Sequence, residues 1–156
     1  MTKYLIIFFL SMVPILELRF AVPFAVGLDL PYVPALVTCV IGNMIPVPII
    51  YLFARKFLVW GSRQKYIGRF CNKFLEKGTK AGRKIVAATG RGGTFVALML
   101  FVGIPLPGTG AWTGTLAASL LDLGPKTTAA AVCLGVIMAG LIMAIASGSV
   151  FHIVGL

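Results

Sequence analysis

Two charged residues, Glu17 and Arg19, lie near the centre of the first apolar stretch of the chain, residues 4–28. A stretch of this length is long enough to enter a bilayer, where a central charge costs at least about 2.5–3.5 kcal/mol. Two prolines, Pro14 and Pro23, bracket the pair and disfavour an uninterrupted helix. In a non-helical turn the two charged side chains can converge, or each can meet a polar group from another segment.

The charged pair has a functional and a structural interpretation. In the functional one, Glu17 lies on a water-accessible pathway and loads and unloads a proton or a cation. Arg19 then holds the site together or binds an anionic group such as phosphate through its forked guanidinium. In the structural one, the two charges neutralise each other or reach water around a loop tip. We favour the functional interpretation, because ionisable residues inside membrane segments are functional by default.

Composition limits the class of protein. The 156-residue chain has a mean hydropathy of +1.01, with 59% hydrophobic and 12% charged residues. So few polar residues cannot cover the surface of a water-soluble domain of this size, so we expect an integral membrane protein. The three cysteines show no metal-ligand spacing, and no metal or other cofactor is expected. The catalytic patterns H-E-x-x-H and G-x-S-x-G are absent, so we expect no enzyme.

Hydropathy divides the chain into four apolar stretches with one basic segment between the second and the third. The apolar stretches are residues 4–28, 31–54, 94–121 and 125–153, and each reaches the roughly 20 residues that a spanning helix needs. Residues 55–93 hold 11 of the 14 basic residues and one acid, Glu76. Because loops rich in Lys and Arg stay in the cytoplasm, we expect a multi-pass protein of the inner (plasma) membrane with this segment cytoplasmic.

The basic segment has its own helical pattern. Apolar residues recur at i, i+3 and i+4 spacing over residues 62–77, with basic residues on the other face. This pattern predicts an amphipathic helix on the anionic inner leaflet, with membrane lipids as partners. The glycines between Thr79 and Gly93 indicate a flexible connection. We expect no nucleic-acid partner, because no aromatic platform or readout motif accompanies the charge.

An internal repeat is the next feature. A shift of 93 residues pairs Leu28, Asp29 and Leu30 with Leu121, Asp122 and Leu123, and Pro14 with Pro107. We therefore expect two repeats, residues 4–54 and 94–153, within one membrane domain, residues 1–156. Asp29 and Asp122 lie beside prolines at stretch ends, where we expect each to cap a helix.

The third apolar stretch contains two prolines and four glycines within residues 103–114. Backbone groups freed by such a break cannot face lipid, so they must be buried in protein or line a polar cavity. The residues predicted to belong to two re-entrant loops are Pro14, Pro23, Gly103, Pro105, Pro107, Gly108, Gly110, Trp112 and Gly114. The residues predicted to line the cavity beside them are Asn43, Pro46 and Pro48.

Two topologies remain open. If the broken stretches are hairpins that return to their own side, each half crosses once, the halves are inverted, and both termini lie outside. If the broken stretches cross fully, the halves are parallel and both termini lie inside. The density of proline and glycine favours the hairpins. The predicted fold is thus an all-α integral membrane protein with two repeats, each a re-entrant helical hairpin plus a transmembrane helix, joined by a basic cytoplasmic amphipathic helix.

These residues carry a family resemblance. Glu17 to Pro23, then Gly42-Asn43 with Pro46 and Pro48, and then the segment 103–114 resemble the small multidrug export protein family. That family is similar to the larger DedA/VTT-type membrane proteins, in which two re-entrant loops face each other. The resemblance implies that Glu17 and Arg19 lie in the first loop. DedA-type proteins typically carry an arginine in the second loop, whereas residues 94–121 contain no charge.

The family name implies export of small toxic compounds, and the DedA/VTT resemblance implies proton-dependent lipid movement. We expect a transport protein in which Glu17 couples movement of a small amphipathic or cationic compound to protons and Arg19 tunes it. The alternative is a lipid scramblase or translocase acting on a phospholipid or polyprenyl phosphate. A third interpretation is an assembly protein without transport. Four segments are few for an enclosed pathway, so we also expect a homo-oligomer.

Overall fold

A computed structural model describes residues 1–14, 16–64, 68–106 and 109–154. Within these ranges the chain forms seven α-helices and no strand, so the prediction of an all-helical protein is confirmed. The helices are α1 (Thr2–Met12), α2 (Glu17–Gly27), α3 (Tyr32–Met44), α4 (Pro46–Ser62), α5 (Gly68–Gly103), α6 (Ala111–Leu120) and α7 (Pro125–Val154).

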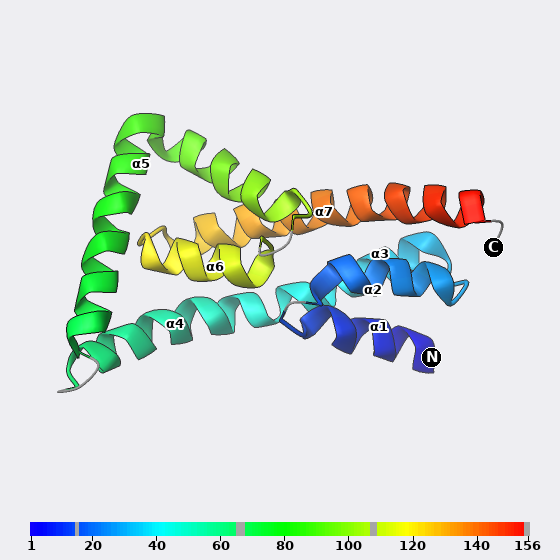
Figure 1. Cartoon of the computed structure of the whole chain (residues 1–156), viewed down its shortest axis with the longest axis horizontal. Coiled ribbons are helices and arrows are strands. Elements are labelled where there is room, and N and C mark those ends of the chain that lie inside the picture. The colour runs from blue at the N-terminus through cyan, green and yellow to red at the C-terminus, as the bar shows by residue number, and fades with distance from the viewer. Residues whose placement is uncertain (15, 65–67, 107–108, 155–156) are drawn as a thin grey trace.

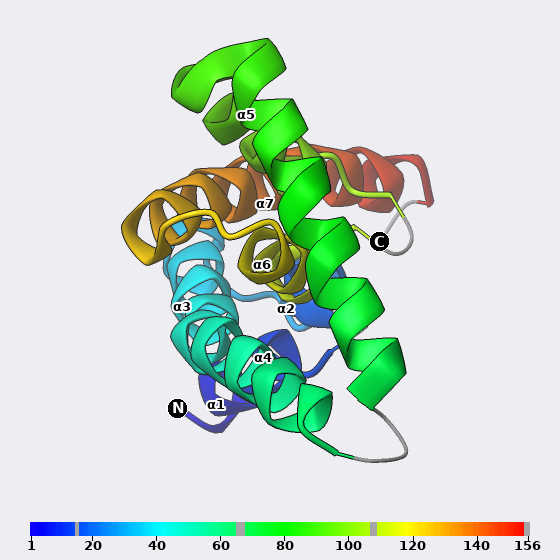
Figure 2. The same cartoon turned by 90° about the vertical axis from the view of Figure 1, so that its left-hand side faces the viewer.

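Two helix pairs approach each other from opposite ends of the molecule (Figure 1). On one side α1 and α2 run back along each other, and the connection between them lies near the centre. On the other side the last part of α5 and α6 do the same. The first part of α5 stands across the ends of α4 and α6 (Figure 2). The two connections that break the apolar stretches therefore lie next to each other.

Two long apolar helical segments, each called a path below, run beside these pairs. Ile45, between α3 and α4, has helical φ and ψ of −60° and −44°, so α3 and α4 follow one path of 31 residues, Tyr32–Ser62. The second path is the 23-residue part of α7 from Pro125 to Ser147. Both are long and apolar enough to span a membrane. Pro46 begins α4, where a missing backbone N–H costs little, and so it does not break the path.

The first connection places its prolines differently from the prediction. Pro14 lies in the connection itself. Pro23 was predicted to belong to the loop, but it lies inside α2. The chain turns instead at Val13, which is extended, and at Glu17, which has a φ of +48°. Few residues other than glycine adopt this left-handed conformation, so the turn stores strain at the charged residue.

The ends of α2 and α6 have the same local geometry. Asp29 and Asp122 have left-handed φ values of 54° and 58°. The N–H of Leu30 donates to the carbonyl of Ala25, and that of Leu123 donates to Ala118, at 3.2 and 3.0 Å. Both turns are therefore Schellman motifs at helix C-termini. Each aspartate therefore supplies the left-handed residue that ends the preceding helix, and α3 begins after Pro31 without a side-chain cap.

The basic segment is more helical than predicted. Residues 55–62 belong to α4, and α5 is helical from Gly68 with a kink at Gly90 (φ 67°, ψ 177°). The predicted flexible connection from Thr79 to Gly93 is therefore wrong. In the predicted amphipathic helix 62–77, residues 65–67 and the apolar side chains that follow lie outside the described residues. Lys80 lies 2.6 Å from Glu76, and this contact lowers the pKa of that exposed carboxyl.

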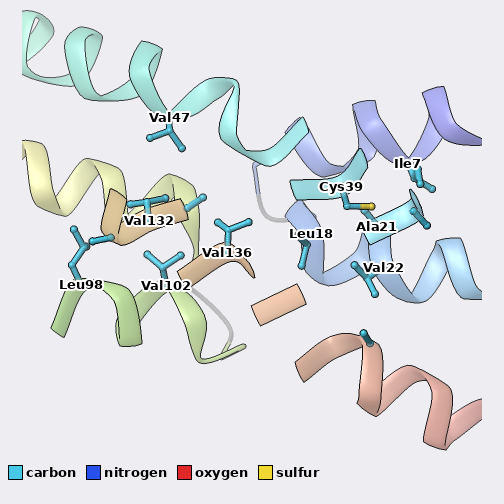
Figure 3. Close-up of a cluster of buried hydrophobic side chains, with 14 of the residues drawn as sticks. Ile7, Leu18, Ala21, Val22, Cys39, Val47, Leu98, Val102, Val132 and Val136 are labelled. Atoms are coloured by element: carbon cyan, nitrogen blue, oxygen red, sulfur yellow. The ribbon is translucent and has the colours of Figure 1, made fainter. Parts of the chain in front are cut away.

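The buried core follows the two helix pairs and α7 (Figure 3). It is built largely from alanine and valine side chains, and each helix contributes at least one side chain that is almost fully buried. Small side chains let helix axes approach closely, which is how helices pack when lipid surrounds them. The labelled core residues are Ile7, Leu18, Ala21, Val22, Cys39, Val47, Leu98, Val102, Val132 and Val136.

Candidate functional site

Glu17 joins the two halves of the molecule. Its side chain starts at the first residue of α2 and reaches the N-terminus of α6, where the backbone N–H of Trp112 donates to Glu17 Oε1 at 3.1 Å. The residue is only 6% exposed. The first N–H groups of a helix have no intrahelical partner, and the helix dipole favours a negative charge there. Glu17 thus serves as the cap of a helix that begins 94 residues later in the chain.

Gly110 makes room for this carboxylate. A Cβ atom added there would lie 2.1 Å from Glu17 Oε2, far inside van der Waals contact. Gly110 also has a φ of 149°, a conformation that side chains disfavour. Two independent constraints, the close carboxylate and the backbone angle, therefore require glycine at this position.

Arg19 binds the connection that precedes α6. Its Nη1 donates to the carbonyl oxygen of Leu106, and its Nη2 donates to Thr109 Oγ1 at 2.6 Å. Thr109 Oγ1 also lies 2.8 Å from the carbonyl oxygen of Ile104 and 2.9 Å from that of Leu106. The carbonyl oxygen of Leu106, three residues after the end of α5, also accepts from the backbone N–H of Thr109 at 3.2 Å. The forked guanidinium adds a charged donor to this carbonyl and fixes the hydroxyl beside it.

In a further contact between the connections, the second half is the donor, as it is in the contact with Glu17. The indole N–H of Trp112 donates to the carbonyl oxygen of Met12, the last residue of α1, at 3.2 Å. Each connection therefore donates to and accepts from the other. Together these contacts define the junction: Met12, Glu17 and Arg19 from the first half, and Leu106, Thr109, Gly110 and Trp112 from the second.

The structure places the other predicted residues around the junction. Pro14 and Pro105 lie in the two connections, and Gly103 is the last residue of α5. Gly114 lies in α6, where an added Cβ would lie 2.4 Å from a methyl group of Val102. Pro107 and Gly108 lie outside the described residues.

The predicted cavity residues are not part of the junction contacts. Asn43 is buried in α3, and its Oδ1 has no hydrogen-bond partner among the residues that the structure describes. Pro46 is buried at the start of α4, and Pro48 is exposed. In the described part of the chain, His, Cys, Asp and Glu do not gather in groups of three that could hold a metal ion.

Sequence reasoning missed the acceptors of Arg19 and a second polar link. Thr109 is a single threonine with no motif around it, and backbone carbonyls have no signature in residue type. The second link joins α4 to α6: the hydroxyl of Tyr51 donates to the carbonyl oxygen of Leu123, and Ser119 Oγ donates to that of Tyr51 at 3.0 Å. Tyr51 is 7% exposed, and a buried tyrosine hydroxyl needs such a partner.

Comparison with known proteins gives one match. The family model described as "Putative small multi-drug export protein" matches residues 17–142, which is more than half of the chain. The matched range begins at Glu17 and contains both sides of the junction except the end of α1. Neither a curated protein nor a solved structure matches this chain.

Proposed function

We propose, from the premise that this chain belongs to the small multi-drug export protein family, that it is a membrane transport protein that moves a small amphipathic or cationic compound in exchange for protons. The junction is the proposed coupling site. One observation carries the proposal: a buried carboxylate from one half, Glu17, caps a helix of the other half. A proton or a cation that binds this carboxylate competes with the contact that holds the halves together.

The coupling mechanism follows from the strength of that contact. When Glu17 is ionised, its hydrogen bond with the N–H of Trp112 is charge-assisted, and such bonds are roughly twice as strong as neutral ones. When Glu17 is protonated or neutralised by a cationic substrate, the bond weakens and the dipole of α6 no longer favours the contact. The equilibrium between a closed and an open junction then depends on the charge at Glu17.

Arg19 has a different part in this mechanism. Its guanidinium stays charged at all working pH values, so its contacts with Leu106 and Thr109 do not respond to protons. We infer that Arg19 keeps the second connection attached while the Glu17 contact opens and closes. It also places a positive charge beside the carboxylate, which favours release of the proton or cation.

The arrangement of the helices supports an inverted repeat around this site. The two helix pairs enter from opposite ends, and both chain termini lie at the end away from the start of α5 (Figure 1). The Schellman turns at Asp29 and Asp122 recur at the 93-residue spacing. In the proposed topology each pair is a re-entrant hairpin, α3 with α4 and α7 each cross once, and the basic segment is cytoplasmic. A homo-oligomer would complete the pathway.

Transport of a fluorescent cation tests the proposal. The protein is reconstituted into vesicles with an acidic interior, and accumulation of ethidium is followed with and without a protonophore. We expect wild type to accumulate ethidium and Glu17→Gln to be at least about tenfold slower, because the amide can neither bind nor release a proton. Glu76→Gln is the matched control, because that glutamate is exposed on α5.

The same vesicles separate this proposal from its rivals. If Glu17→Gln and wild type accumulate ethidium equally, proton coupling at Glu17 is wrong. If neither moves ethidium but wild type moves a fluorescent phospholipid across the bilayer, the scramblase alternative replaces the proposal. If neither compound moves, a role in assembly without transport is the remaining interpretation, and chemical cross-linking in native membranes then tests whether copies associate.

A further inference from the structure

The last part of α4 contains a groove that the proposed function does not use. Its volume is about 430 Å³, and its described lining is Tyr51, Leu52, Lys56, Val59, Trp60 and Arg63. From Leu52 onward these residues recur at spacings of three and four, so they lie along one face of the helix. The groove begins at the buried Tyr51 and ends at Arg63, which follows the last residue of α4.

Apolar and cationic side chains alternate along this face. Leu52, Val59 and Trp60 are 58%, 41% and 56% exposed. Lys56 and Arg63 are seven residues apart, which is about 10.5 Å along a helix, so both long side chains can reach one group between them. Tryptophan at the end of a membrane helix is typical of the level of the lipid headgroups.

We propose that this groove binds an anionic phospholipid, with its phosphate between Lys56 and Arg63 and an acyl chain along Leu52, Val59 and Trp60. A water-soluble anion would pair with the two cations but would not contact the apolar lining. A lipid without net charge would cover the lining but would not neutralise the two cations. Only an amphiphile with a negative head satisfies both parts of the groove.

The size of the groove and its anchor fit this occupant. A volume of about 430 Å³ is within the range of sites for small organic ligands, and it exceeds what a single inorganic ion needs. Tyr51 fixes the inner end, because its hydroxyl and its carbonyl oxygen both bond to the end of α6 and the turn after it. The described lining thus comes from α4 and the residue that follows it, and α4 is held against α6 at the inner end of the groove. The inference does not rest on the proposed transport activity.

Fluorescence of Trp60 tests the proposal directly. The chain has two tryptophans, so Trp112→Phe leaves Trp60 as the only indole. This variant is titrated in micelles with phosphatidylglycerol or phosphatidylcholine that carries bromine atoms on the acyl chains, which quench a nearby indole. We expect half-maximal quenching at a mole fraction on the order of tenfold lower for phosphatidylglycerol. In Trp60→Phe, which reports from Trp112, the two lipids should quench alike.

Charge variants decide where the preference arises. Lys56→Gln with Arg63→Gln should remove the preference for phosphatidylglycerol, whereas Lys56→Arg with Arg63→Lys should retain it. The matched control is Lys73→Gln with Lys84→Gln, which removes the same charge from exposed positions of α5 and should leave the preference unchanged.

Three results would overturn the proposal. The first is equal quenching of Trp60 by the two lipids. The second is an equal loss of preference in the groove variant and in the α5 control, since the net charge of the chain, +10, would then account for the attraction. The third is full reversal of quenching by inorganic phosphate at the ionic strength of a matched chloride control, since the site would then bind the free anion.

Discussion

The two connections at the junction correspond in sequence position but differ in chemistry. Glu17 and Gly110 are 93 residues apart, both have positive φ values, and each lies where a helix begins. The first connection brings two charged side chains. The second brings no charge, and it offers the N–H of Trp112 and the carbonyl oxygen of Leu106 instead. Charge on one half and backbone groups on the other are therefore enough to join the two.

This difference explains why residues 94–121 need no charged residue. Two facing carboxylates would repel each other in a medium of low dielectric constant, and two facing arginines would do the same. A helix N-terminus and a backbone carbonyl can bind charged groups but carry no net charge themselves. The asymmetry of the sequence thus places the ionisable part of the junction on one half alone.

The largest expected effect on stability comes from adding a side chain to the second connection at Gly110, the position that corresponds to Glu17 in the first. Gly110→Ala adds a Cβ that lies 2.1 Å from the Glu17 carboxylate, at a φ of 149°. We expect a loss of roughly 2–6 kcal/mol in the free energy of unfolding in mixed micelles, from backbone strain together with overpacking. The double variant with Glu17→Ala should recover the packing part. If the effects of the two substitutions on the free energy of unfolding are additive, the close contact between these residues is not the cause of the loss in Gly110→Ala.

The breaks themselves were predictable from the sequence, and their exact limits were not. Proline and glycine density located both connections, because backbone strain and lost hydrogen bonds depend on residue type. Pro23 was misplaced because a proline inside α2 removes one hydrogen bond that tertiary packing outweighs. The helix through Thr79 to Thr89 was missed because each glycine costs only about 1 kcal/mol in a helix, and one kink at Gly90 relieves the strain.

The charged half of the site was also predictable, and its partners were not. Glu17 and Arg19 were conspicuous because charge is rare in an apolar stretch. Their partners are mainly backbone atoms of Trp112 and Leu106, which every residue carries, so only the fold can identify them. The left-handed turns at Asp29 and Asp122 were not predicted, because aspartate favours both N-caps and such turns.

The second-largest effect concerns the arginine of the first connection. Arg19→Ala removes two hydrogen bonds donated by a charged group, to Leu106 and Thr109. We expect a loss of about 2–4 kcal/mol in unfolding free energy. Arg19→Lys keeps the charge but cannot fork to both acceptors, so it should lose about half as much. If Arg19→Lys loses as much unfolding free energy as Arg19→Ala, the forked geometry of the guanidinium accounts for the whole effect. If Arg19→Lys loses none, the positive charge accounts for it.

A smaller effect isolates the single side chain of the second connection that accepts from Arg19. Thr109→Val keeps the shape of the residue and removes the hydroxyl, so we expect a loss of about 1 kcal/mol in unfolding free energy. Thr113→Val is the control, since among the described residues that exposed hydroxyl makes only a long contact of 3.4 Å, with the carbonyl oxygen of Gly110. An equal effect of the two substitutions would contradict a specific role for Thr109.

The smallest effect tests whether the two halves really share their backbone geometry. Asp29 and Asp122 both have left-handed φ values, where an added Cβ costs about 1 kcal/mol. Each is replaced by Gly and by Ala, and the unfolding free energies of the two variants are compared at the same position. This difference cancels whatever contacts the aspartate side chain makes. Inside a helix a Gly variant is less stable than an Ala variant. At these left-handed positions the order must reverse, so that the Gly variant has the larger free energy of unfolding. A reversal of similar size at both positions is expected, whereas a reversal at only one would show that the halves match in sequence spacing but not in strain.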